Sequence, residues 1–323
     1  MKTRLAVILL VLTAFGGATA QEAEKPAEFV SYQSDLCIFK LQGCELTGPV
    51  ERAIVFGVTR IFDTYKESFG FEYPDDYKIK ITIFADKDNF IAYQKKQGKK
   101  SLASSAYYSV RFREAVVYWK KYSKKTDDAK KMVGTVYHEA SHMLLMTKVP
   151  RVPLWINEGL AEYFDGLNVF GDNRRVYLNK HSQRWLTRWA KKGLPIGFEE
   201  YLSLSRSKWY KFDEKIKDCH AAYIIGYSLV YFMMSRSNTE TVLKELLWEF
   251  KRQGEKANSV NVVNIHYPGG CERFEQIWHK WILRARPYRP LRALRKQAEK
   301  SKEDPTTEIK ASKNEGQDLQ NSR

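Results

Sequence analysis

Two histidines and a glutamate lie close together near the middle of the chain, in the segment His138-Glu139-Ala140-Ser141-His142. Residues four apart lie on the same face of an α-helix, so both imidazoles can bind one metal ion from a single helix. A zinc ion lowers the pKa of a bound water to about 7, and a neighbouring carboxylate can accept the proton of that water. The spacing therefore predicts His138 and His142 as zinc ligands and Glu139 as a general base.

The residues around this segment favour a helix over 130–146. Histidines held only by packing or hydrogen bonds, without a metal, are the alternative interpretation. We prefer the metal site because the motif lies on a segment whose apolar side chains recur at helical spacing. These side chains are Val133, Val136, Tyr137, Ala140, Leu144 and Leu145.

A catalytic zinc site normally takes three protein ligands and keeps one position open. The segment 155–164, which reads WINEGLAEYF, offers Glu158 and Glu162 on one face of a second predicted helix. One carboxylate can bind the metal while the other orients a ligand, because a metal-bound histidine usually donates its second ring N–H to a carboxylate or a carbonyl. The spacing alone leaves open which glutamate has which role.

The segments HEASH and NEGLAEYF together resemble the gluzincin metallopeptidases, the group that contains thermolysin and the aminopeptidase N family. They resemble in particular the peptidase-MA-like families of secreted bacterial proteins, and the similarity covers about residues 75–235. The resemblance implies that Glu158 is the third zinc ligand and that Glu162 orients the first histidine. It also implies that Glu139 is the base of a peptide hydrolysis.

Gluzincins commonly use a downstream Tyr or His to hydrogen-bond the tetrahedral intermediate. The segment 222–232, which reads AYIIGYSLVYF, is similar to a tyrosine-bearing helix of the peptidase-MA-like families. The resemblance implies Tyr223 for this role, with Tyr227 and His220 as alternatives. Both tyrosines could equally be core aromatics of a helix.

Two further features bear on the substrate. Residues 107–119 could form a hairpin whose last strand borders the active-site helix and holds an extended peptide by main-chain hydrogen bonds. The G-x-M-E-N segment with which aminopeptidases of this group grip a free N-terminus is missing from the sequence. Endopeptidase activity is therefore the better expectation.

The fold expected is α+β and zincin-like, with a small N-terminal sheet, the active-site helix and a helical C-terminal half. The metal would lie between the halves. Residues 21–35 read as a polar leader, and no internal repeat is evident. Strands are expected over 77–84, 106–111 and 115–120, and helices over 48–69, 86–97, 130–146, 155–164, 179–192, 219–235, 239–252 and 271–285.

Residues 1–20 are expected to be a secretory signal peptide. Lys2 and Arg4 precede a short apolar run, and Ala18-Thr19-Ala20 matches the small-residue cleavage pattern. Cleavage would leave no transmembrane segment and would place the protein outside the cytoplasm, secreted or periplasmic. The folded domain is then 21–289, and the charged stretch 290–323 is expected to be a disordered tail.

Four cysteines fit an exported chain and suggest two disulfides, for which three pairings exist. Cys37 and Cys44 are close enough in sequence to close a small loop, which leaves Cys219 to pair with Cys271. Buried thiols are the alternative.

The net charge of +16 permits contact with anionic cell-surface polymers, although a merely solvated basic surface explains it as well. We find no nucleic-acid-binding motif. The expected function is zinc-dependent hydrolysis of a peptide or protein substrate. The alternatives are a catalytically silent binding protein with this fold and a zinc amidase that acts on cell-wall peptides.

Overall fold

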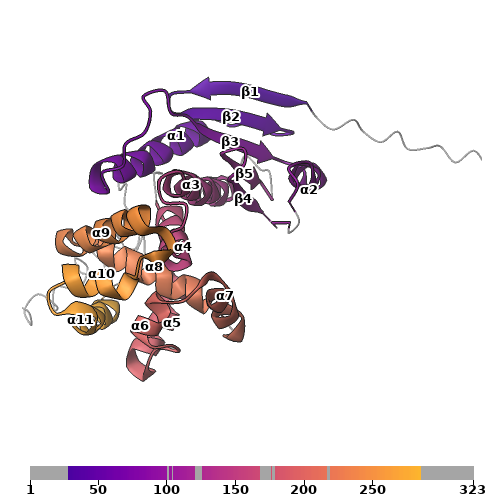
Figure 1. Ribbon diagram of the computed structural model, residues 1–323. Helices are drawn as coiled ribbons and strands as arrows, with labels where there is room; N and C mark the ends of the chain where they lie inside the picture. Colours follow the sequence, from indigo (N-terminus) through magenta and orange to yellow (C-terminus); the bar gives the residue numbers. More distant parts are fainter. Residues whose placement is uncertain are drawn as a thin grey trace, which may run out of the picture.

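The computed structural model describes residues 28–99, 102–103, 105–120, 126–167, 176, 179–216 and 219–284. The expected signal peptide and the expected tail lie outside these residues. The fold is α+β, as predicted: a five-stranded sheet forms in the N-terminal part, and helices make up the C-terminal half (Figure 1). Within the described residues, no helix combines the length and the apolar character that a membrane span requires.

The sheet is mixed and has the strand order β1-β2-β3-β5-β4. The three central strands β2, β3 and β5 are parallel, and β1 and β4 pair antiparallel to them at the two edges. The strands are β1 (Phe29–Ser34), β2 (Cys37–Gln42), β3 (Ile79–Phe84), β4 (Ala106–Ser109) and β5 (Glu114–Tyr118).

Successive side chains of a strand point to opposite faces of the sheet, and both faces are covered here. Val117 of β5 belongs to the main core, in which α1 (Gly48–Asp63) and α3 (Thr126–Lys148) pack. Its neighbour Val116 belongs instead to a small cluster with Phe90 of α2 (Lys87–Lys96) on the other face. The site described below therefore lies on the α1/α3 side of the sheet.

The structure corrects two expectations for the sheet. Residues 29–34 are not part of a leader: they form β1, an edge strand whose side chains are only partly buried, which explains their polar composition. The predicted hairpin forms, but its last strand, β5, lies inside the sheet between β3 and β4. The free edge on this side is β4, the first strand of the hairpin.

The four cysteines lie among the described residues, and neither predicted disulfide is formed. Cys37 begins β2 and Cys44 follows its end. The strand rises by roughly 3.3 Å per residue along its whole length, so the two Cα atoms lie well beyond the ~7 Å that a disulfide allows. The Cys44 thiol instead donates to the carbonyl of Ile83 at 3.8 Å. The Cys271 thiol donates to the carbonyl of Val260 at 3.6 Å.

Two buried tyrosines fix α3 against the rest of the core. Tyr137 donates a hydrogen bond to the carbonyl of Ala53 in α1 at 2.5 Å. Its ring occupies the space above Gly57, where a Cβ would lie 2.1 Å from the ring carbon Cζ. Tyr65, in the π-helical turn that follows α1 (Thr64–Ser68), shares a 3.0 Å hydrogen bond with Ser141. These contacts hold one face of α3 inside, so the face with the two motif histidines is left for the site.

The C-terminal half surrounds α8 (Ala221–Met234), a helix that is apolar on almost all sides and therefore central. Sequence periodicity predicted its longer members but not the short helices α6, α7 and α10. The other helices are α4 (Leu154–Asp165), α5 (Lys180–Lys192), α6 (Phe198–Leu202), α7 (Arg206–Lys215), α9 (Ser237–Gln253), α10 (Ser259–His266) and α11 (Gly270–Arg284), with a 3₁₀ turn at Gly254–Lys256.

The helices α4 and α8 approach each other through two glycines. A Cβ on Gly159 would lie 2.6 Å from the carbonyl oxygen of Gly226. A Cβ on Gly226 would in turn lie 2.8 Å from the carbonyl oxygen of Trp155. Because the obstacles are backbone atoms, neither helix can accept a larger residue without moving. This contact sets the position of α4, which carries Glu158.

Gly159→Ala should therefore destabilise the protein, even though alanine is the better helix former by ~1 kcal/mol. We expect the free energy of unfolding to fall by about 1–3 kcal/mol, the usual cost of overpacking. Urea unfolding followed by circular dichroism measures it. Gly197→Ala is the matched control, because the nearest atom to its added Cβ is 3.8 Å away and its φ is −62°. Equal stability of Gly159→Ala and the parent protein would contradict the close approach.

Candidate metal centre

The structure brings His138, His142 and Glu158 together from two helices. The Nε2 atoms of the two histidines are 3.1 Å apart, and the Oε2 atom of Glu158 lies 3.8 Å from the first and 3.7 Å from the second. Ligands about 2.0–2.1 Å from a tetrahedral zinc ion lie roughly 3.3–3.4 Å from one another. The three atoms thus form a triangle close to the size that one ion requires.

The hydrogen-bond partner of His142 determines which ring nitrogen is available. Its Nδ1 lies 3.1 Å from Oδ1 of Asn157, an atom that can only accept, so Nδ1 carries the proton. The lone pair of Nε2 then faces the other two ligand atoms. Asn157 is buried on α4, one residue before Glu158. Its role was missed in the sequence because an Asn beside a ligand has no characteristic spacing of its own.

Glu162 lies one turn after Glu158, on the outer side of the first histidine. Its Oε1 is 3.9 Å from Nδ1 of His138, while Nε2 of the same ring faces Glu158. Glu162 was predicted to orient His138, and its position beside Nδ1 fits that role. Burial, followed by the charges of Asp165 and Glu158, raises the pKa of Glu162 to about 7. Burial also lowers the pKa of His138, which favours the neutral imidazole that a metal requires.

Glu139, the predicted base, is buried beside the three candidate ligand residues, with 6% of its surface exposed. Burial is the main cause that raises its pKa to about 7, and the charge of Glu158 adds to it. A hydrogen bond with the backbone of Tyr108 in the edge strand β4 acts in the opposite direction. A carboxyl group that titrates near neutrality is well matched to accepting and returning a proton.

The two tyrosines proposed to stabilise the oxyanion have different surroundings in the structure. The hydroxyl of Tyr227 accepts a hydrogen bond from the backbone N–H of Asn179 at 3.1 Å, and its ring is buried, so it holds the start of α5. Tyr223 is only partly buried and packs edge-on against Trp209, with 4.5 Å between ring centroids. Burial and the nearby charge of Glu158 both raise its pKa. Of the two tyrosines, Tyr223 is therefore the less buried one and the one whose pKa is raised by the candidate ligand Glu158.

His220, the other alternative, precedes α8 and is held by a residue that the sequence did not single out. Asp213 of α7 places Oδ2 3.0 Å from Nδ1 of His220, whose side chain is 84% exposed. The other carboxylate oxygen of Asp213 accepts the backbone N–H of Ala222 at 2.9 Å. One carboxylate thus fixes both the first turn of α8 and the ring beside Tyr223.

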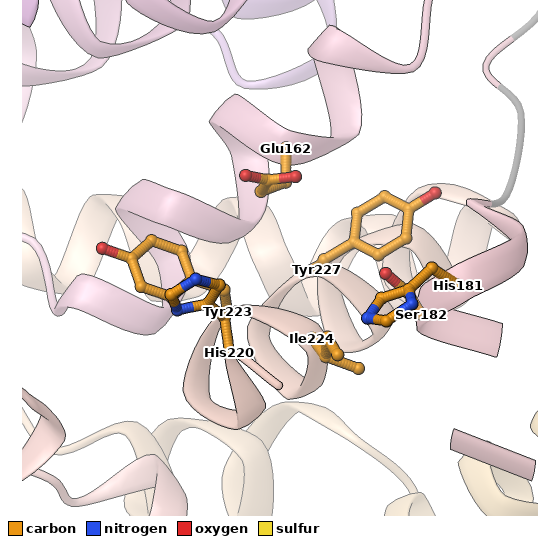
Figure 2. Close-up of a pocket in the computed structure, with 7 residues that line it drawn as sticks. All are labelled: Glu162, His181, Ser182, His220, Tyr223, Ile224 and Tyr227. Atoms are coloured by element: carbon orange, nitrogen blue, oxygen red, sulfur yellow. The ribbon is translucent and has the colours of Figure 1, made fainter. Parts of the chain in front are cut away.

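A cavity of about 390 Å³ adjoins this centre between α4, α5 and α8 (Figure 2). Glu162 lines one side of it and Tyr223 and His220 line another, while His181 and Ser182 of α5 lie across from them. The cavity therefore shares Glu162 with the surroundings of the metal ligands.

Residues 132–248 match a protein family model described as a protein of unknown function, DUF1570. The match covers less than half of the chain, but it runs from α3 into α9 and includes all three candidate ligand residues. A comparison with curated proteins gives no match.

The ligand trio predicts one bound zinc ion per chain, and His142→Ala should remove most of it. Loss of one of three protein ligands leaves an incomplete site. Asn157→Ala should weaken zinc affinity by roughly 10–100-fold, because it frees the ring orientation of His142. Zinc content after dialysis, measured by mass spectrometry, tests both, with His266→Ala on α10 as a control histidine outside the site. A parent protein that binds no zinc would refute the assignment.

Glu158 and Glu162 should differ in how strongly they affect zinc binding. Glu158→Ala removes a ligand oxygen, so affinity should collapse. Glu162→Ala removes a carboxylate that lies near the far ring nitrogen of His138 and not near a metal-facing one, and a loss of roughly 10–100-fold is expected. Titration against a competing chelator gives both values. If Glu162→Ala loses more affinity than Glu158→Ala, the two roles must be exchanged.

Proposed function

We propose that the protein is a zinc metallopeptidase that cleaves peptide bonds within extracytoplasmic proteins or peptides. The observation that carries the proposal is the convergence of His138, His142 and Glu158 with the buried carboxyl of Glu139 directly beside them. Two imidazoles and one carboxylate form a donor set of the kind found in catalytic zinc sites, which keep a further position open. The neutral tautomer fixed at His142 and the lowered pKa of His138 suit the same ion.

When bound, zinc supplies Lewis acidity toward a carbonyl and makes water acidic enough to be deprotonated near neutral pH. Glu139 then accepts the proton of the attacking water at its carboxylate and passes it to the nitrogen of the departing amine. Tyr223 donates a hydrogen bond from its hydroxyl to the carbonyl oxygen as negative charge develops there. Asn157 and Glu162 hold the two imidazoles in place.

The position of β4 at the edge of the sheet fits the binding of an extended peptide substrate. Its outer backbone groups have no partner strand within the described sheet, and Tyr108 of this strand contacts Glu139. A peptide that adds to this edge as a further strand would bring its backbone alongside the candidate base. A long substrate bound in this way fits an endopeptidase.

Two alternatives lead to different measurements. A silent binding protein would keep the fold and the zinc without turnover, although the presence of Glu139 beside the ligands favours an enzyme. A zinc amidase would cleave cell-wall peptides and leave ordinary peptides intact. The basic net charge suits contact with anionic cell-surface polymers in either case.

Glu139→Gln should retain zinc and the fold but lose hydrolysis by at least about 100-fold, because general-base catalysis contributes 10²–10⁴-fold. The measurement is digestion of a proteome-derived peptide library by the zinc-loaded mature protein and by the variant.

Glu240→Gln, on α9 and outside the candidate ligand trio, serves as the control substitution and should leave activity unchanged. Equal cleavage by the parent and Glu139→Gln would contradict the mechanism. Cleavage of cell-wall peptides alone would favour the amidase, and no cleavage of either would favour the binding protein.

A further inference from the structure

The cavity between α4, α5 and α8 opens beside the candidate metal centre rather than at a separate place on the surface. Glu162 belongs to both: one of its oxygens lies 3.9 Å from Nδ1 of His138, and its carboxylate faces the cavity (Figure 2). Tyr223, the candidate oxyanion donor, lines the same cavity. A substrate whose scissile bond lay at the metal would therefore have a neighbouring side chain within reach of this space.

We propose that this cavity is the subsite that receives a cationic side chain, Lys or Arg, of the substrate. The inference rests on the proposed peptidase function and names the substrate class of that same site.

The charges of the residues around the cavity favour a cationic ligand. Among the residues that the structure describes, no Lys or Arg lines the cavity, whereas Glu162 does. Within the described part of the chain, the only ion-pair partner of Glu162 within 4.0 Å is His138. That imidazole must be neutral when it binds a metal, so no cationic side chain of the described residues pairs with this carboxylate. A ligand's cation would fill this position.

The shape and the lining of the cavity also suit a long cationic side chain. Tyr223 and Tyr227 line it with aromatic rings, and cations bind favourably over such faces. Its volume of about 390 Å³ falls in the range of small-ligand sites, which is ample for a long side chain. His181 and Ser182 lie across the cavity from Glu162 and can accept or donate hydrogen bonds at its far end. An acidic side chain would instead be repelled by Glu162.

Binding can be tested without hydrolysis in the zinc-loaded full chain that carries Glu139→Gln. The probes are Nα-acetyl-arginine methylamide and its neutral analogue Nα-acetyl-norleucine methylamide, titrated by NMR. We expect the arginine probe to bind about tenfold more tightly, and His181→Lys to abolish that difference by placing a positive charge in the cavity. His181 is exposed in the first turn of α5, so the substitution should not disturb folding.

Selectivity is then measured with the active protein on peptide pairs that differ only in Lys against Leu at the selected position. His181→Lys should lower the Lys/Leu ratio of kcat/KM about tenfold, and His181→Asp should raise it. His266→Lys, the same substitution on an exposed histidine of α10, should leave the ratio unaltered.

The proposal is overturned if both probes bind equally, if acidic side chains are preferred, or if His181→Lys and His266→Lys change the ratio alike. Failure of the proposed function has a different signature. In that case no peptide is cleaved, but the arginine probe still binds in the cavity with its predicted preference.

Discussion

The packing of α3 against α4 is the constraint on which the rest of the site depends. Two ligands come from one helix and the third from the other, so a shift of about 1 Å between them would open the triangle formed by His138, His142 and Glu158. Buried hydrogen bonds hold α3 in place, and a close backbone contact holds α4. Tyr137 and Tyr65 fix α3 from the core side, and backbone atoms of α8 press directly against Gly159 of α4.

The buried carboxyl groups of the site lower the stability of the folded protein when no cation is bound. Burial raises the pKa of Glu139 and of Glu162 to about 7, from the ordinary value of 4.5. Between those values the folded state holds more protons than the unfolded state, so without a metal ion the stability falls as pH rises through roughly 4–7. A bound divalent cation would favour the charged form of these buried carboxyl groups and so offset this loss of stability. The centre and the cavity beside it thus form an acidic region inside a chain of net charge +16.

The parts of this account that the sequence predicted are those encoded locally. The two histidines and Glu139 follow from helical spacing, and the longer helices follow from apolar periodicity. The spacing did not rank Glu158 against Glu162, because both lie on one face of α4; the distances do so by bringing only Glu158 close to both ligand nitrogens. Whether zinc is bound and peptides are hydrolysed stays a prediction.

The features that the sequence missed arise from long-range packing. Asn157 and Asp213 acquire their roles through partners brought together only by folding. The cysteines were paired by sequence distance, whereas β2 keeps Cys37 and Cys44 far apart. Short helices such as α6 and a half-exposed edge strand such as β1 contain too few periodic residues to stand out.

The most direct test of the central claim is X-ray absorption at the zinc edge of the metal-loaded protein. The account predicts nitrogen and oxygen ligands only, at about 2.0–2.1 Å, with the outer-shell scattering of two imidazoles. A contribution from sulfur at about 2.3 Å, or scattering from one imidazole or none, would contradict a centre built from His138, His142 and Glu158.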